Sequence, residues 1–170
     1  MIEKNETISI LRSQNRHKLT LAQYVHHRNG VPLGASGSLQ NMLYRSFGAG
    51  SFRTFWQYWN PIWGYALGRF IYAPSQRFLP SALALILTFT ISGALHDLAT
   101  TLVRQSEAFF FTPWFFLMGL AIIVEQAFKI NHSKFPWKVR ASINFMYILT
   151  CLGLTILILQ LSSLYAVNSY

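Results

Sequence analysis

Charged side chains are scarce in this chain of 170 residues, and acidic ones are the scarcest. Charged residues make up 11% of the sequence, with 14 Lys and Arg against 5 Asp and Glu. Soluble domains usually carry about 25% charged residues. This depletion, together with 52% hydrophobic residues, argues against an ordinary soluble domain and directs attention to how the apolar residues are clustered.

The sequence contains a single cysteine, which excludes an intrachain disulfide. Cys151 lies inside an apolar run, where we expect a buried, unreactive thiol. The first forty residues lack the apolar core of a cleavable signal peptide, so we expect no secretion signal there. The sequence also has no internal repeat and no low-complexity tract, which disfavours a small transporter or proton-relay protein built from inverted repeats.

Three long apolar runs are present, at residues 79–103, 109–128 and about 141–164. A helix that crosses a bilayer needs about 20 mostly apolar residues. The runs therefore predict an all-α integral membrane protein with about three transmembrane helices.

The basic residues follow the pattern of membrane topology. Short cytoplasmic loops are enriched in Lys and Arg. The segment before the first run and the loop 129–140 are basic, whereas the loop after the first run holds Arg104 against Glu107, and the last nine residues are uncharged. This pattern predicts a multi-pass protein with residues 1–78, including the N-terminus, and the loop 129–140 on the cytoplasmic side. It also accounts for the net charge of +9, so we expect membrane lipids as partners and no nucleic acid.

Residues 1–51 are polar and contain several Gly and Ser residues, and we separate them from a membrane domain at residues 52–170. Helices are predicted at about residues 19–27 and 39–47. The glycines do not lie between a strand and a helix, which disfavours a phosphate-binding loop. His26 and His27 are adjacent, so on a helix they point apart, and no cysteine or acidic residue is near. We therefore expect no metal site.

The segment 52–74, "FRTFWQYWNPIWGYALGRFIYAP", is rich in aromatic residues and carries Arg53 and Arg69. Trp and Tyr concentrate at the membrane–water boundary, so the segment predicts an aromatic interfacial or re-entrant helix, with Pro61 starting its second part. An aromatic membrane anchor does not require a polar amide, so Asn60 in the middle of the cluster is not explained by anchoring alone.

A histidine and an aspartate, His96 and Asp97, interrupt the first apolar run. Residues four apart share a helix face, so His96 continues a polar stripe that includes Ser92. An ionisable residue within a membrane is costly and suggests a functional site. A catalytic or transporting histidine and a structural, hydrogen-bonding histidine both fit the pattern. Asp97 is predicted to reach the outer interface or to pair with Arg104.

Three segments resemble the membrane-bound O-acyltransferase family, and within it the wax-synthase-like branch, which is related to sterol and diacylglycerol acyltransferases. "SFRTFWQYWNPIWGYALGRFIYAP" resembles the family's F-W-x-x-W-N/H segment, and "ISGALHDL" resembles its S-G-x-x-H-D/E segment. "WFFLMGLAIIVEQAFK" is similar to an aromatic-rich helix that ends in a glutamate, which maps onto Glu125. Asn60 precedes His96 by 36 positions, close to the separation in the family, and the resemblance covers about residues 51–130.

The resemblance implies transfer of a long-chain acyl group from acyl-CoA to a hydroxyl acceptor, of the wax-ester or acylglycerol type. It implies no cofactor besides acyl-CoA as co-substrate. His96 matches the membrane histidine thought to act as general base, and Asn60 matches a second site position that orients the imidazole or donates to the oxyanion. The residues expected to bind the substrate or the donor are Arg53, Trp56, Trp59, Arg69 and Ser92.

The chain departs from the family in its number of membrane segments. Family members usually have eight or more, and this chain resembles only the C-terminal half. It therefore either assembles with copies of itself or with a partner subunit, or acts as a minimal enzyme. The alternative is a non-catalytic truncated relative that serves as a membrane assembly partner.

Overall fold

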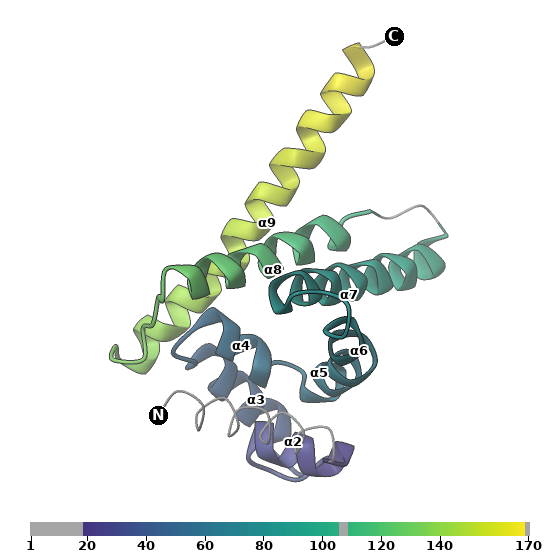
Figure 1. Cartoon of the computed structure of the whole chain (residues 1–170). Coiled ribbons are helices and arrows are strands. Elements are labelled where there is room, and N and C mark those ends of the chain that lie inside the picture. The colour runs from purple at the N-terminus through teal and green to yellow at the C-terminus, as the bar shows by residue number, and fades with distance from the viewer. Residues whose placement is uncertain (1–18, 106–108, 169–170) are drawn as a thin grey trace.

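The computed structural model describes residues 19–105 and 109–168, which fold into helices joined by turns, with no strand among them (Figure 1). The first 18 residues, on which part of the signal-peptide prediction rests, and Glu107 lie outside the described residues. The all-helical architecture confirms the predicted fold class.

The two N-terminal helices lie where the sequence predicts them. Helix α2 covers Leu21–Asn29, and Thr20 and Gln23 form a capping box at its start. Helix α3 covers Ser38–Phe47. Gly30, with φ of 79°, ends α2 in the left-handed conformation that glycine adopts without strain.

The end of α3 is bound to the last helix, α9 (Trp137–Asn168). The Asn144 side-chain amide donates to the backbone oxygens of Phe47 at 3.0 Å and Ala49 at 2.9 Å. The Trp137 indole donates to the oxygen of Tyr44 at 3.0 Å. The bond to Phe47 satisfies a carbonyl that the helix end leaves without a partner. The three bonds together hold the polar segment against α9. The domain division at residue 51 stays a prediction.

The aromatic segment forms a series of short helices. These are α4 (Phe52–Tyr58), α5 (Pro61–Leu67), the π-helical turn η1 (Gly68–Tyr72) and α6 (Ala73–Ser75). Pro61 occupies the first position of α5, as predicted, because a proline there has no N–H to leave unpaired.

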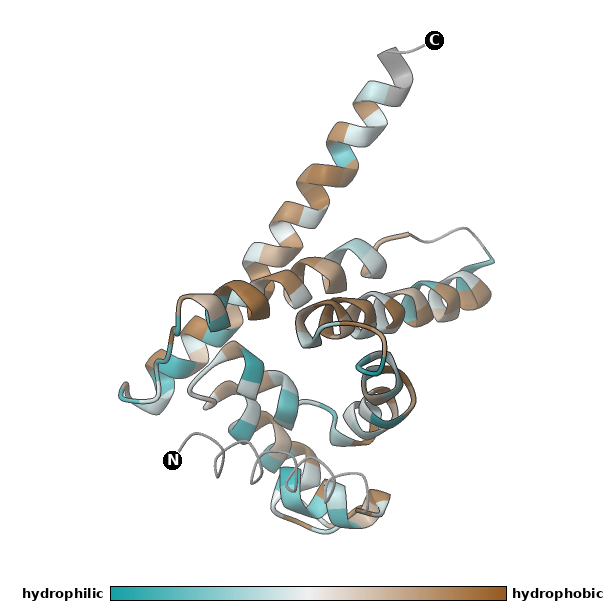
Figure 2. Cartoon of the chain, viewed as in Figure 1, coloured by the Kyte–Doolittle hydropathy of each residue, from teal (hydrophilic) through white to brown (hydrophobic). Residues whose placement is uncertain are grey.

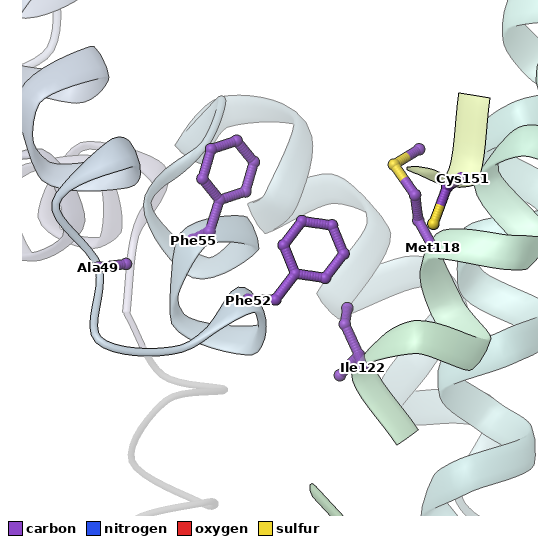
Figure 3. Close-up of a cluster of buried hydrophobic side chains, with 6 residues drawn as sticks. All are labelled: Ala49, Phe52, Phe55, Met118, Ile122 and Cys151. Carbon is purple, nitrogen blue, oxygen red and sulfur yellow. The ribbon is translucent and has the colours of Figure 1, made fainter. Parts of the chain in front are cut away.

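Part of this segment is core and not a surface anchor. Phe52 and Phe55 are 0% and 1% exposed and pack with Met118, Ile122 and Cys151 (Figure 3). Cys151 is 5% exposed, so the prediction of a buried thiol is confirmed. The cluster joins α4 to the apolar helices, and it thereby fixes the aromatic segment against them.

Helices α7 (Ser81–Arg104) and α8 (Phe111–Ala127) lie side by side as a hairpin (Figure 1). A Cβ atom at Gly93 would lie 2.6 Å from the backbone oxygen of Phe111. The missing side chain therefore permits the start of α8 to approach α7 closely. Gly119 plays a similar part against Phe89, where a Cβ would lie at 3.2 Å.

Two helices, α7 and α9, are long and apolar enough to cross a membrane by length and composition, whereas α8 is a shorter apolar helix of 17 residues. Hydrophobic residues dominate all three (Figure 2). The C-terminal half of α9 extends away from the other helices (Figure 1), and Leu157 and Leu164 on it are 50% and 59% exposed.

Candidate active site

A cavity of about 460 Å³ lies between the aromatic segment and the α7–α8 hairpin. It brings together every residue that the sequence predicts for the site, namely Arg53, Trp56, Trp59, Asn60, Arg69, Ser92 and His96. Among its lining residues, Arg53 and Arg69 are exposed, whereas Ser92 and Ile122 are buried. The cavity wall is therefore basic where it meets solvent, and it is apolar or weakly polar inside the protein.

His96 is half-buried on α7 and lies among aromatic rings. Its ring centroid is 5.0 Å from that of Phe115 and 5.6 Å from that of Phe111. Its Nδ1 lies 2.6 Å from the backbone oxygen of Ser92, one turn earlier. A carbonyl oxygen only accepts, so Nδ1 carries the hydrogen. In the neutral ring, Nε2 then keeps the lone pair that a general base needs.

Trp63 completes the surroundings of the histidine. Its indole Nε1 donates to Oγ of Ser92 at 2.9 Å, and its ring meets His96 edge-on, with centroids 6.0 Å apart and planes at 90°. Sequence reasoning counted Trp63 only as part of the aromatic cluster. The signal that could have distinguished it is its position three residues after Asn60, within the first turn of a helix that begins with proline.

Asn60 caps α5. Its backbone has φ of 40°, in the left-handed region, and its Oδ1 accepts from the backbone N–H of Trp63 at 3.2 Å. Asparagine is one of the few residues that adopt this conformation readily. Asn60 is exposed and lines the same cavity as His96, and Trp63 is the residue that connects the two.

The other tryptophans contribute differently to the wall. Trp59 stacks on Phe55 with centroids 5.5 Å apart. Trp56 meets Phe89 edge-on at 5.3 Å, and its buried Nε1 has no hydrogen-bond partner among the described residues. A buried, unpaired donor is costly, and here it belongs to a residue that lines the cavity.

The cavity arginines keep donors available for a ligand. Arg53 Nη1 donates to the side chain of Gln126 at 2.5 Å, and Arg69 Nη1 donates to the Tyr65 hydroxyl at 2.6 Å. A guanidinium has five N–H donors, so one bond leaves most of each group free to bind an anion.

A sequence model of the membrane-bound O-acyltransferase family matches residues 21–163. The chain belongs to this family. No curated protein and no solved structure matches it. The match extends beyond the motif region at about residues 51–130 and includes α2, α3 and most of α9. Family membership makes this a membrane protein and supports an acyltransferase activity.

The structure corrects the prediction about Asp97 in this member of the family. The carboxylate does not reach for the interface or for Arg104; it is 5% exposed and caps the start of α8. Oδ1 accepts from the N–H groups of Phe110 at 2.9 Å and Phe111 at 2.8 Å, and Oδ2 accepts from the N–H and hydroxyl of Thr112 at 2.8 and 2.6 Å. The start of a helix offers unpaired N–H donors, which the hairpin brings within reach.

Glu125 has a comparable structural role at the other end of the hairpin. It is 2% exposed and accepts from the backbone N–H groups of Phe52 at 2.6 Å and Arg53 at 3.0 Å, at the start of α4. It does not line the cavity. In this chain the glutamate therefore holds the helix that carries Arg53 and Trp56, and it acts on the cavity through that helix.

The residues 19–105 and 109–168 contain no group of three or more His, Cys, Asp or Glu side chains placed to hold a metal ion. His26 and His27 are both exposed on α2.

Proposed function

We propose that this protein is an acyl-CoA-dependent O-acyltransferase that forms esters with a hydroxyl acceptor of the wax-ester or acylglycerol type. The observation that carries the proposal is the cavity in which His96 is placed, with Nδ1 occupied by the Ser92 carbonyl, beside arginines and an aromatic wall. The resemblance to the wax-synthase-like branch supports this choice of acceptor.

The reaction uses His96 as a general base. Nε2 takes the proton of the acceptor hydroxyl as its oxygen attacks the carbonyl carbon of the thioester. The tetrahedral intermediate then expels the CoA thiolate, which takes the proton from the imidazolium. An ester and free CoA thiol result. Trp56 lines the cavity, and its indole N–H has no partner among the described residues; because this N–H is buried, a shift of the ring that exposes it would offer a donor to the developing oxyanion.

The donor binds through its phosphates and its apolar chain. Arg53 and Arg69 supply positive charge where the cavity opens, and no acidic residue occurs between Thr7 and His96. The acyl chain lies along the inner wall, near Phe89, Phe115 and Ile122. That wall excludes water, which would otherwise hydrolyse the thioester.

The proposed topology places the donor on the cytoplasmic side. Residues up to α6 and the loop between α8 and α9 are basic, and such segments stay in the cytoplasm. His96 is 15 residues beyond Ser81, or about 22 Å along α7. A long acyl chain entering from the cytoplasm is therefore the substrate that matches a base at this depth.

Lipid mass spectrometry tests the proposal. Cells that express the protein should contain an ester that is absent from cells without it and from cells with His96→Ala. Protein abundance, measured alongside, separates loss of chemistry from loss of protein. The proposal is wrong if His96→Ala lowers abundance and leaves the ester formed per molecule unchanged.

Binding of radiolabelled palmitoyl-CoA to the purified protein in nanodiscs tests the donor site. Binding should be saturable, weakened by salt, and weakened by Arg53→Gln or Arg69→Gln. Arg77→Gln is the matched control, because Arg77 is exposed and basic but lies outside the cavity wall. Equal losses of palmitoyl-CoA binding in all three variants would indicate that Arg53 and Arg69 serve membrane topology and do not bind the donor.

A second candidate function is that of a membrane assembly partner without its own activity. The C-terminal half of α9 is the surface available to such a partner, because it extends away from the other described helices and its exposed apolar side chains can face another helix as well as lipid. This candidate predicts that His96→Ala leaves the protein's cellular role intact and that crosslinks form from Leu157 or Leu164 to another chain.

A further inference from the structure

We propose that Asn60 is a positioning residue that acts on His96 through Trp63. Its side-chain oxygen fixes the first turn of α5, and this turn places the Trp63 indole against Ser92 and His96. The proposal rests on the proposed function only for the role of His96 as the base. It differs from a role in which the Asn60 amide itself touches the substrate.

The first step concerns the backbone at Asn60. The residue combines φ of 40° with a side chain that accepts from the N–H of Trp63. The first four N–H groups of a helix have no partner within the helix. Pro61, the first residue of α5, has no N–H. Asn60 Oδ1 accepts from the backbone N–H of Trp63, which is one of these unpaired donors. The same residue carries the indole that donates to Ser92.

The second step concerns Trp63. Its side chain is 36% exposed, so surrounding core packing does not hold it on every side. Its backbone N–H is bound to Asn60, and its indole N–H is bound to Ser92 Oγ, which belongs to a residue that is 2% exposed. These two bonds at opposite ends of the residue determine where its ring lies.

The third step concerns His96. Ser92 binds the imidazole through its carbonyl oxygen and the indole through its hydroxyl. Trp63 meets the imidazole edge-on, and Phe111 and Phe115 of α8 lie against it as well. Three rings from two elements therefore orient the imidazole, and α5 contributes its share only while the Asn60 cap holds.

The two roles of Asn60 require opposite ends of its amide. A cap needs the oxygen, because that atom accepts from Trp63. An oxyanion donor needs the N–H group. Aspartate keeps the oxygen and the tolerance for the left-handed backbone but has no N–H. Asn60→Asp therefore separates the two roles, while Asn60→Ala removes both.

The acyl-transfer test compares variants of the full chain in nanodiscs, with palmitoyl-CoA and a long-chain alcohol. Asn60→Ala and Trp63→Phe should each lower kcat by about ten- to a hundred-fold, since small misplacements of a catalytic group have effects of this size. Asn60→Asp should restore most of the activity that Asn60→Ala loses. The double variant should be little worse than either single one, because the residues act as a unit.

A spectroscopic readout keeps the test independent of turnover. Nitrogen NMR of ¹⁵N-histidine-labelled protein, with His96 assigned by its substitution, should show its ring signals shifted in Asn60→Ala and Trp63→Phe and unchanged in Asn60→Asp. Trp137→Phe is the matched control, because it removes an indole N–H that donates to Tyr44, and Trp137 does not line the cavity. It should leave the His96 signals unchanged.

The outcomes separate this proposal from the proposed function. If the His96 signals shift in Asn60→Ala and Trp63→Phe but the wild-type protein shows no acyl transfer, the positioning role is supported and the transferase is overturned. Loss of activity in Asn60→Asp with unchanged His96 signals would assign Asn60 to the oxyanion and overturn the positioning role. Unchanged His96 signals in Asn60→Ala would overturn it too, whatever Trp63→Phe shows, because the Trp63 ring itself lies against His96.

Discussion

Asn in place of Asp97 should destabilise the hairpin of α7 and α8. The carboxylate accepts four hydrogen bonds of 2.6 to 2.9 Å from Phe110, Phe111 and Thr112 and is not among the residues that line the cavity. In Asp97→Asn one oxygen remains to accept from Phe110 and Phe111. The amide N–H₂ group faces the N–H of Thr112, so that donor loses its acceptor.

The size of the effect follows from these bonds. A buried donor left without a partner costs about 1–3 kcal/mol. The two bonds to the remaining oxygen lose their charge assistance, which roughly doubles the strength of such bonds. The loss of negative charge at a helix N-terminus costs about 0.3–1 kcal/mol more. We expect a total of about 3 kcal/mol in the free energy of unfolding, against about 5–15 kcal/mol for a typical domain.

Unfolding by SDS in mixed micelles, followed by tryptophan fluorescence, measures this loss. Thr90→Val is the matched control on α7, because it removes a hydroxyl whose bond, among the described residues, is to the oxygen of Ile86 one turn earlier; it should cost about 0.5 kcal/mol or less. Equal midpoints for Asp97→Asn and Thr90→Val would refute the capping role. An equal loss of stability in Arg104→Gln would instead support the ion pair between Asp97 and Arg104 that the sequence predicts as an alternative.

Three further results are expected. His96→Gln should lower acyl transfer by about a hundred- to ten-thousand-fold while the abundance of the protein stays unchanged. Near-normal turnover in this variant would show that His96 is not the general base. Gly93→Ala should destabilise the protein by about 1–3 kcal/mol in the same SDS titration, because its Cβ would meet Phe111, whereas Gly153→Ala, where a Cβ meets open space, should be neutral or stabilising. Lys134→Cys in a cysteine-free background should react with an impermeant thiol reagent only from the cytoplasmic side, and labelling from the outer face alone would invert the topology.

The sequence was most informative where its signal is local. Hydropathy and helix-end residues predicted α7, α9 and the short N-terminal helices to within a few residues, because burial and capping depend on neighbours in the chain. Pro61 marked the start of α5 for the same reason. The motif order placed Asn60 and His96 in one site, and both line one cavity, although their chemical roles stay predictions.

The sequence was least informative where partners are distant. Asp97 bonds to residues 13 to 15 positions away, and Glu125 bonds to backbone groups 73 and 72 positions away. A carboxylate in an apolar run can reach for solvent, for a cation or for a helix start, and only the folded hairpin decides among these. The role of Trp63 is not predictable from the sequence for a related reason. A tryptophan that donates a hydrogen bond to a distant serine cannot be distinguished in sequence from one that anchors the chain at a membrane surface.

The cap that Glu125 places on α4 has a consequence for the order in which the molecule is made. Phe52 and Arg53 leave the ribosome long before Glu125, since synthesis runs from the N-terminus. We expect α4 to remain incompletely held, and the cavity to lack a finished wall, until α8 has emerged. Translation arrested before residue 125 should leave a cysteine introduced at Thr54 fully reactive, and translation arrested well beyond it should slow the reaction of that cysteine, because position 54 is half-buried in the folded chain. Protection before α8 emerges would show that α4 settles without its cap.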